Sequence, residues 1–182
     1  VNLISSIKCF SNEIKICDIK GLYSIFVFQA FLGGLIYYII SLIILKITKS
    51  KIVSLLSVII IIISESFSEF FSTILIETVS FFIFVLFLFI WLKLFQEKKF
   101  SNRNLIYLAI LLGLLTLLKP SYQYLFYGVI LFFFIRIYLS KNNEKINNTN
   151  LLVFIISFYI ILIPWCLRNY FVLDSFSLTS DY

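Results

Sequence analysis

Long apolar runs separated by short polar and basic stretches make up most of this chain. The runs cover residues 22–45, 52–63, 78–92, 105–118, 122–138 and 151–163. An α-helix needs about 20 apolar residues to cross the roughly 30 Å hydrocarbon core of a bilayer, whereas the second run reaches only about 18 Å. The pattern predicts an all-α polytopic integral membrane protein with six hydrophobic helices, one of them short.

The same pattern divides the chain into three regions. Residues 1–21 form a mixed polar lead outside the bilayer, residues 22–170 the transmembrane helical domain, and residues 171–182 the start of a loop. The sequence has no Met, and its last residues show no closing element. We interpret it as an internal fragment of a longer protein, and we expect no activity from it as a separate chain.

Composition narrows the class of partner. The chain is 62% hydrophobic and 13% charged, which is more apolar than a soluble domain of this length. Its net charge of +6 comes from short clusters between the apolar runs, which favours membrane lipids and not nucleic acid as partners. Three cysteines (Cys9, Cys17, Cys166) without metal-ligand spacing, and no histidine, indicate neither a zinc site nor a disulfide framework.

The basic residues are distributed unevenly between alternate loops. Ten of the fifteen Lys and Arg lie in residues 46–51, 93–103 and 136–145. Because cytoplasmic loops carry the excess of Lys and Arg, these three loops are predicted to be cytoplasmic. Both ends of the chain are then predicted on the outer face. The charged residues of the alternate segments are predicted there too: Glu65, Glu69, Glu77, Asp174, Asp181, Lys119 and Arg168.

The last apolar run meets Pro164, Trp165 and Arg168. Proline kinks or ends a helix, and Trp and Arg are common at the membrane interface, so we expect the helix to leave the bilayer near this point. Arg168 is then expected at the level of lipid head groups. Two interpretations stay open: an anchor that fixes helix depth, or a cation that meets an anionic substrate.

No predicted span carries an ionisable residue at its centre. Proton relays and ion-coupled transport sites usually need such residues inside the membrane, so a secondary transporter is disfavoured. The polar groups gather instead at the predicted outer surface. This placement favours chemistry at the interface on a lipid-linked anion.

Four short stretches resemble a known family in order and approximate spacing. They are Val27–Leu32, Ile76–Ser80, Gly113–Pro120 and Pro164–Tyr170. Together they resemble bacterial polytopic glycosyltransferases of the GT-C fold, the group related to protein O-mannosyltransferases and to the aminoarabinose transferase of lipid A (glycosyltransferase family 39). The resemblance covers about residues 22–180.

The resemblance implies a transferase of the bacterial inner (plasma) membrane. Such an enzyme moves a sugar from a polyprenyl-phosphate donor to a glycan, lipid or protein acceptor on the outer face. An acidic general base in the first outer loop is expected, and that loop would precede Leu22. Glu13 and Asp18 do not show the family's aspartate pattern. We therefore leave the catalytic residue unassigned and expect the base upstream of Val1.

The resemblance also implies roles for outer-face residues. Arg168 and Lys119 are candidates for binding the donor phosphate, with arginine the better fork for phosphate oxygens. Glu77 is a candidate for contact with a sugar hydroxyl or a cation. Glu65 and Glu69 are four residues apart, so a helix would place both on one face, where they could hold a divalent cation. No cofactor is evident, and a metal requirement stays open.

Simpler interpretations exist for each of these residues. Lys119 would also fit a lysine that snorkels from a helix end, Glu77 an acid at a helix start, and Glu65 with Glu69 a solvated acidic turn. At the level of the protein, the alternatives are a polysaccharide flippase, a polymerase-like or other transport protein, and a non-catalytic membrane subunit.

Overall fold

The structure is a computed structural model and describes residues 19–64, 75–97, 101–139, 148–174, 176 and 178. These residues form helices and no strands, which confirms the all-α prediction. The elements are α1 (Ile19–Thr48), α2 (Lys51–Ile63), α4 (Leu75–Glu97), α5 (Asn102–Leu118), the 3-10 turn η2 (Pro120–Tyr122), α6 (Gln123–Leu139) and α7 (Asn148–Leu173).

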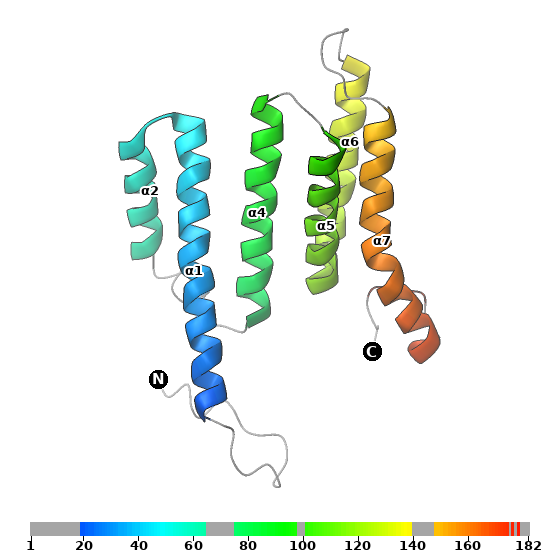
Figure 1. Cartoon of the computed structure of the whole chain (residues 1–182), viewed down its shortest axis with the longest axis horizontal. Coiled ribbons are helices and arrows are strands. Elements are labelled where there is room, and N and C mark those ends of the chain that lie inside the picture. The colour runs from blue at the N-terminus through cyan, green and yellow to red at the C-terminus, as the bar shows by residue number, and fades with distance from the viewer. Residues whose placement is uncertain are drawn as a thin grey trace.

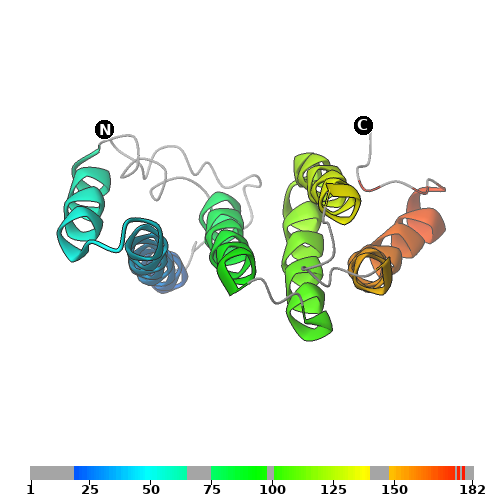
Figure 2. The same cartoon turned by 90° about the horizontal axis from the view of Figure 1, so that it is seen from above.

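The helices stand side by side in one curved row. Seen from above, the row runs α2, α1, α4, α5 and α7, and α6 lies against α5 beside the row (Figure 2). Consecutive helices point in alternate directions (Figure 1). The C-terminal ends of α1, α4 and α6 therefore lie at the same end of the row as the N-terminal ends of α2, α5 and α7.

Four helices are long and apolar enough to cross a membrane: Ile25–Thr48, Ile76–Gln96, Pro120–Tyr138 and Thr149–Val172. Many large apolar side chains on them are exposed, as expected of surfaces that face lipid. These spans confirm a multi-pass membrane protein. The predicted short helix is confirmed as the 13 residues of α2, and α5, with 17 residues, is also shorter than a full span.

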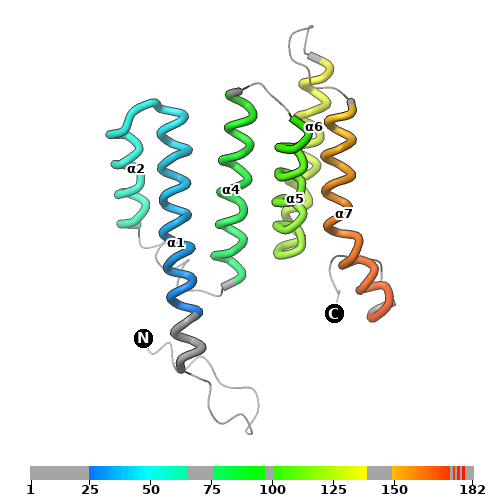
Figure 3. The backbone as a smooth tube through the Cα atoms, in the orientation of Figure 1, coloured from blue at the N-terminus to red at the C-terminus, as the bar shows by residue number. Residues whose placement is uncertain are grey.

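Helix α7 continues through Pro164 to Leu173, ten residues past the expected apolar run 151–163. Proline removes one backbone hydrogen bond and crowds the preceding turn, which bends a helix that neighbouring contacts hold together. The second half of α7 accordingly turns away from the axis of the first half (Figure 3). Of the two outcomes expected at this proline, the kink occurs and the helix does not end there.

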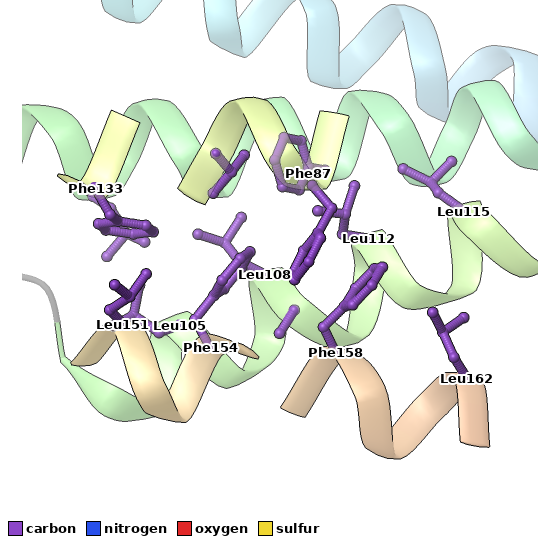
Figure 4. Packing of buried hydrophobic residues seen from close by; sticks show 14 residues of the cluster. Phe87, Leu105, Leu108, Leu112, Leu115, Phe133, Leu151, Phe154, Phe158 and Leu162 are labelled. Atoms are coloured by element: carbon purple, nitrogen blue, oxygen red, sulfur yellow. The ribbon is translucent and has the colours of Figure 1, made fainter. Parts of the chain in front are cut away.

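The largest buried cluster surrounds α5. Leucines of α5 pack against aromatic side chains of α4, α6 and α7, as Figure 4 shows. The rings of Phe126 and Phe158 stack with centroids 3.7 Å apart and so join α6 to α7. Gly113 lets α5 and α7 approach closely, since a Cβ there would lie 2.9 Å from Cβ of Ile161. This cluster runs along α5 and holds α4, α5, α6 and α7 together.

The end of the row with the basic helix termini has its own contacts. Nζ of Lys46 lies 4.9 Å from the centroid of the Phe89 ring, and the Arg136 guanidinium lies 5.1 Å from that of Phe95. Side chains of this kind bury their stems and keep the charge near water. Lys46 and Arg136 thus both lie against aromatic rings, at the end of the row predicted to be cytoplasmic.

Candidate functional site

The residues predicted for the outer face lie at the other end of the row. Glu77 is in the first turn of α4, Lys119 follows the last residue of α5, and Arg168 is in the second half of α7. All three belong to helix ends that point the same way in Figure 1. Glu65 and Glu69 lie outside the described residues, as do Glu13 and Asp18.

Glu77 and Lys119 form an ion pair between α4 and α5. Nζ of Lys119 lies 3.7 Å from Oε1 of Glu77, and the two side chains are 47% and 38% exposed, respectively. Lys119 is extended (φ −141°, ψ 109°) because Pro120 follows it, and this ends α5. An ion pair this exposed contributes at most about 1 kcal/mol to stability, so its main effect is to place opposite charges together.

Buried polar side chains lie next to this ion pair. Ser80 donates a hydrogen bond to the carbonyl of Ile76 (2.7 Å), and Thr116 donates one to that of Leu112 (2.8 Å). The Thr78 hydroxyl is fully buried, and no hydrogen-bond partner for it occurs in the described part of the chain. In the sequence, Thr78 and Ser80 stood out only as members of the motif Ile76–Ser80. Their burial could not be predicted, because a hydroxyl residue in an apolar run can face either lipid or another helix.

Arg168 is held by two neighbours on its own helix. Its guanidinium lies 4.8 Å from the centroid of the Trp165 ring, and Nη1 donates a hydrogen bond to Oδ1 of Asn169 (3.2 Å). Trp165 and Asn169 are four residues apart, so they share one face of α7. Asn169 is only 2% exposed, whereas the Arg168 side chain is exposed. The sequence predicted Trp165 at the interface, but it gave no sign that Asn169 is buried.

The two cations at the end of the row predicted to be outer therefore differ in their electrostatic surroundings. Lys119 lies against a carboxylate. Arg168 has an amide and an aromatic ring as neighbours, and no carboxylate lies within ion-pair distance of it among residues 25–64, 76–96, 101–138, 149–172 and 174. Neutral partners orient a guanidinium without cancelling its charge. Arg168 is thus the better placed of the two to bind an anion.

A cavity of about 180 Å³ lies between α6 and α7, towards the N-terminal end of α6. Aromatic rings dominate its lining, including Phe126, Tyr127, Phe158 and Tyr159, and Cys166 also contributes. Phe176 and Leu178 from the end of the chain complete the wall. This lining suits an apolar chain and not a charged group.

Within the described residues, no cluster of three or more His, Cys, Asp or Glu is arranged to hold a metal ion. Of the three carboxylates predicted to contact a sugar or a cation, the described segments include Glu77, and its neighbour is a lysine. The site as described is therefore a pair of cations near the C-terminal ends of α5 and α7. Lys119 is paired with a carboxylate, and Arg168 has neutral neighbours.

Comparison with known proteins identifies the family. The model of the family described as dolichyl-phosphate-mannose-protein mannosyltransferase (PMT) matches residues 21–179. The chain belongs to the PMT family. The match confirms the resemblance inferred from the four motifs and extends over nearly the same residues. PMT proteins are membrane glycosyltransferases that use a sugar linked to polyprenyl phosphate. No curated protein and no solved structure matches this PMT chain.

Proposed function

We propose that the full protein containing this chain is a mannosyltransferase of a bacterial plasma membrane. It takes mannose from a polyprenyl-phosphate donor on the outer face and transfers it to an acceptor hydroxyl; the family's name favours a protein acceptor over a glycan or a lipid. The observation that carries the proposal is Arg168, which has no carboxylate within ion-pair distance among the residues that the structure describes and lies in the last turns of a membrane-spanning helix.

The chemistry of the donor explains why a cation is needed there. In polyprenyl-phosphate mannose the phosphate is a diester with one negative charge. When the bond from the sugar carbon to the phosphate oxygen breaks, polyprenyl phosphate leaves with a second negative charge. A guanidinium beside the phosphate stabilises this developing charge more than it stabilises the bound donor, and such differential binding accelerates the reaction.

Lys119 and Glu77 are proposed to act beside Arg168. Lys119 supplies a second, weaker phosphate contact because its charge is shared with Glu77. Glu77 is placed to accept a hydrogen bond from a sugar hydroxyl, or to hold a divalent cation when one is bound. The apolar cavity between α6 and α7 suits part of the isoprenoid chain, since aromatic and aliphatic side chains make up most of its lining.

A donor assay tests this proposal. The full-length protein in proteoliposomes should transfer labelled mannose from polyprenyl-phosphate mannose to a Ser- or Thr-rich acceptor protein added outside. A soluble sugar nucleotide, GDP-mannose, should not replace the lipid-linked donor. Transfer from GDP-mannose alone, or no transfer from the lipid-linked donor to protein, glycan or lipid acceptors, would contradict the proposed function.

Because Glu77 partly neutralises Lys119, we expect Lys119 to contribute more to donor binding in a variant with a neutral residue at position 77. Lys119→Ala should raise the KM for the lipid-linked donor by no more than about 5-fold, because an exposed, paired lysine contributes about 1 kcal/mol or less. In the Glu77→Gln background, where no carboxylate competes, the same substitution should raise KM by a larger factor. A double-mutant cycle on KM measures this difference.

Equal effects of Lys119→Ala in both backgrounds would show that Glu77 does not moderate Lys119. The melting temperatures of the single variants serve as the control. They should stay close to that of the wild type, because both side chains are about half exposed.

A further inference from the structure

Asn169 is a polar residue buried near the C-terminal end of the membrane-spanning helix α7. A buried asparagine must have its amide hydrogen-bonded, and a helix in a membrane usually carries an apolar residue at such a place. Asn169 is 2% exposed, and its Oδ1 accepts a hydrogen bond from the exposed Arg168 beside it. A buried amide thus holds an exposed cation.

We propose that Asn169 is the positioning residue of the phosphate site: its buried amide oxygen fixes the Arg168 guanidinium over Trp165 and leaves its positive charge available to the donor. The inference rests on the proposed function, because it needs Arg168 to bind the phosphate. Asn169 itself contacts no donor atom and acts through Arg168.

The geometry supports this role through the spacing of three residues. Trp165 and Asn169 lie one turn apart on the same face of α7, and the Arg168 side chain reaches that face with its guanidinium 4.8 Å from the ring centroid. The ring holds one face of the guanidinium and Oδ1 holds Nη1. The remaining N–H groups of this planar fork stay available for the paired hydrogen bonds that arginine makes with phosphate oxygens.

The neutral charge of the partner is the second part of the argument. An aspartate at position 169 would fit the same space and accept the same hydrogen bond, but it would cancel the charge that the phosphate needs. Lys119 already shows the paired arrangement at the same end of the row. An amide gives orientation without neutralisation.

Pre-organisation explains why such a residue is useful. A free arginine side chain at a membrane interface samples many rotamers and can associate with lipid head groups. Fixing it before the donor arrives lowers the entropy that binding would otherwise have to remove. Asn169 is expected to influence KM for the donor more than kcat.

Two substitutions at this position separate charge from packing. Asn169→Ala removes the hydrogen bond and should raise the KM for polyprenyl-phosphate mannose about 3- to 10-fold, as expected for loss of one orienting hydrogen bond. Asn169→Asp keeps the size and should raise KM more, by about 10- to 100-fold, because it pairs with Arg168. The aspartate variant should nevertheless stay folded.

Asn150→Ala is the matched control. Asn150 is also a buried asparagine of α7, 8% exposed, but it lies at the opposite end of the helix. Its truncation should lower the melting temperature about as much as Asn169→Ala does and should leave KM unchanged. Retention of undecaprenyl phosphate by each purified variant gives a binding readout that does not depend on turnover.

A double-mutant cycle with Arg168→Ala decides between the explanations. If Asn169 acts through Arg168, Asn169→Ala should add nothing to the KM of the Arg168→Ala variant. Additive effects, or an Asn169→Asp variant with wild-type KM, would overturn the positioning role of Asn169. Neither result would contradict phosphate binding by Arg168. If Arg168→Ala alone leaves both KM and phosphate binding unchanged, the proposed function fails first.

Discussion

Arg168→Ala is expected to raise the KM for polyprenyl-phosphate mannose by about 10- to 100-fold and to lower kcat as well. A hydrogen bond to a charged group is worth about 1.5–3 kcal/mol, and about 1.4 kcal/mol corresponds to a tenfold change. The effect on kcat follows because the leaving polyprenyl phosphate gains charge as the bond breaks. Steady-state kinetics with the lipid-linked donor measure both constants.

Arg136→Ala provides the matched control for this result. Arg136 also lies over aromatic rings, those of Phe95 and Phe132, but at the opposite end of the row. Its removal should leave the donor KM unchanged. Arg168→Lys should recover only part of the loss, because an ammonium group cannot reproduce the paired geometry of the guanidinium. If Arg136→Ala and Arg168→Ala behave alike, Arg168 is an interfacial anchor.

Gly113→Leu is expected to lower the free energy of unfolding by about 1–3 kcal/mol, the usual cost of overpacking a well-packed core. A Cβ at Gly113 would lie 2.9 Å from Cβ and 3.0 Å from Cγ2 of Ile161, so α5 and α7 would have to separate. Thermal unfolding in detergent measures this loss. Because Arg168 lies on α7 and Lys119 at the end of α5, activity should fall with stability.

Gly128→Leu on α6 is the control for this substitution. No atom lies within 4 Å of a Cβ placed at Gly128, so the larger side chain should be accommodated there without loss of stability. In the Gly113→Ala variant, adding Ile161→Ala should restore little, since Cβ of Ile161 remains. Leucine favours a helix more than glycine does, so helix propensity cannot explain a loss of stability. Equal losses from Gly113→Leu and Gly128→Leu would therefore contradict the close approach to Ile161 as the cause.

The alternating directions of the described helices could be predicted from two features of the sequence. The length of each apolar run indicates a helix, and the charge of each loop indicates the side on which the loop lies. Lys46, Lys93 and Arg136 lie at helix ends on one side of the row, and Glu77, Lys119 and Arg168 on the other (Figure 1). The helix bounds were less accessible. Helix α1 extends from Ile19 to Thr48 around the predicted 22–45, because backbone hydrogen bonding continues past the last apolar side chain.

The candidate site was predictable only where charge marks it. Glu77 and Lys119 are 42 positions apart, and only the packing of α4 on α5 brings them together. Gly128 and Gly113 look alike in sequence, since each is a single glycine in an apolar run, but the close contact at Gly113 depends on Ile161 of another helix. Asn169 was missed because an asparagine at the membrane interface is usually exposed, and its burial depends on tertiary contacts.

The order of the helices in the row has a consequence for biosynthesis. Each described helix after α1 packs on one that precedes it in the chain: α2 and α4 on α1, α5 on α4, and both α6 and α7 on α5. A ribosome delivers helices from the N-terminal end, so every arriving helix finds its neighbour already in the bilayer. Until α7 arrives, the leucines of α5 that it covers face lipid. The Arg168 end of α7 is therefore the last part of this layer to be placed during translation.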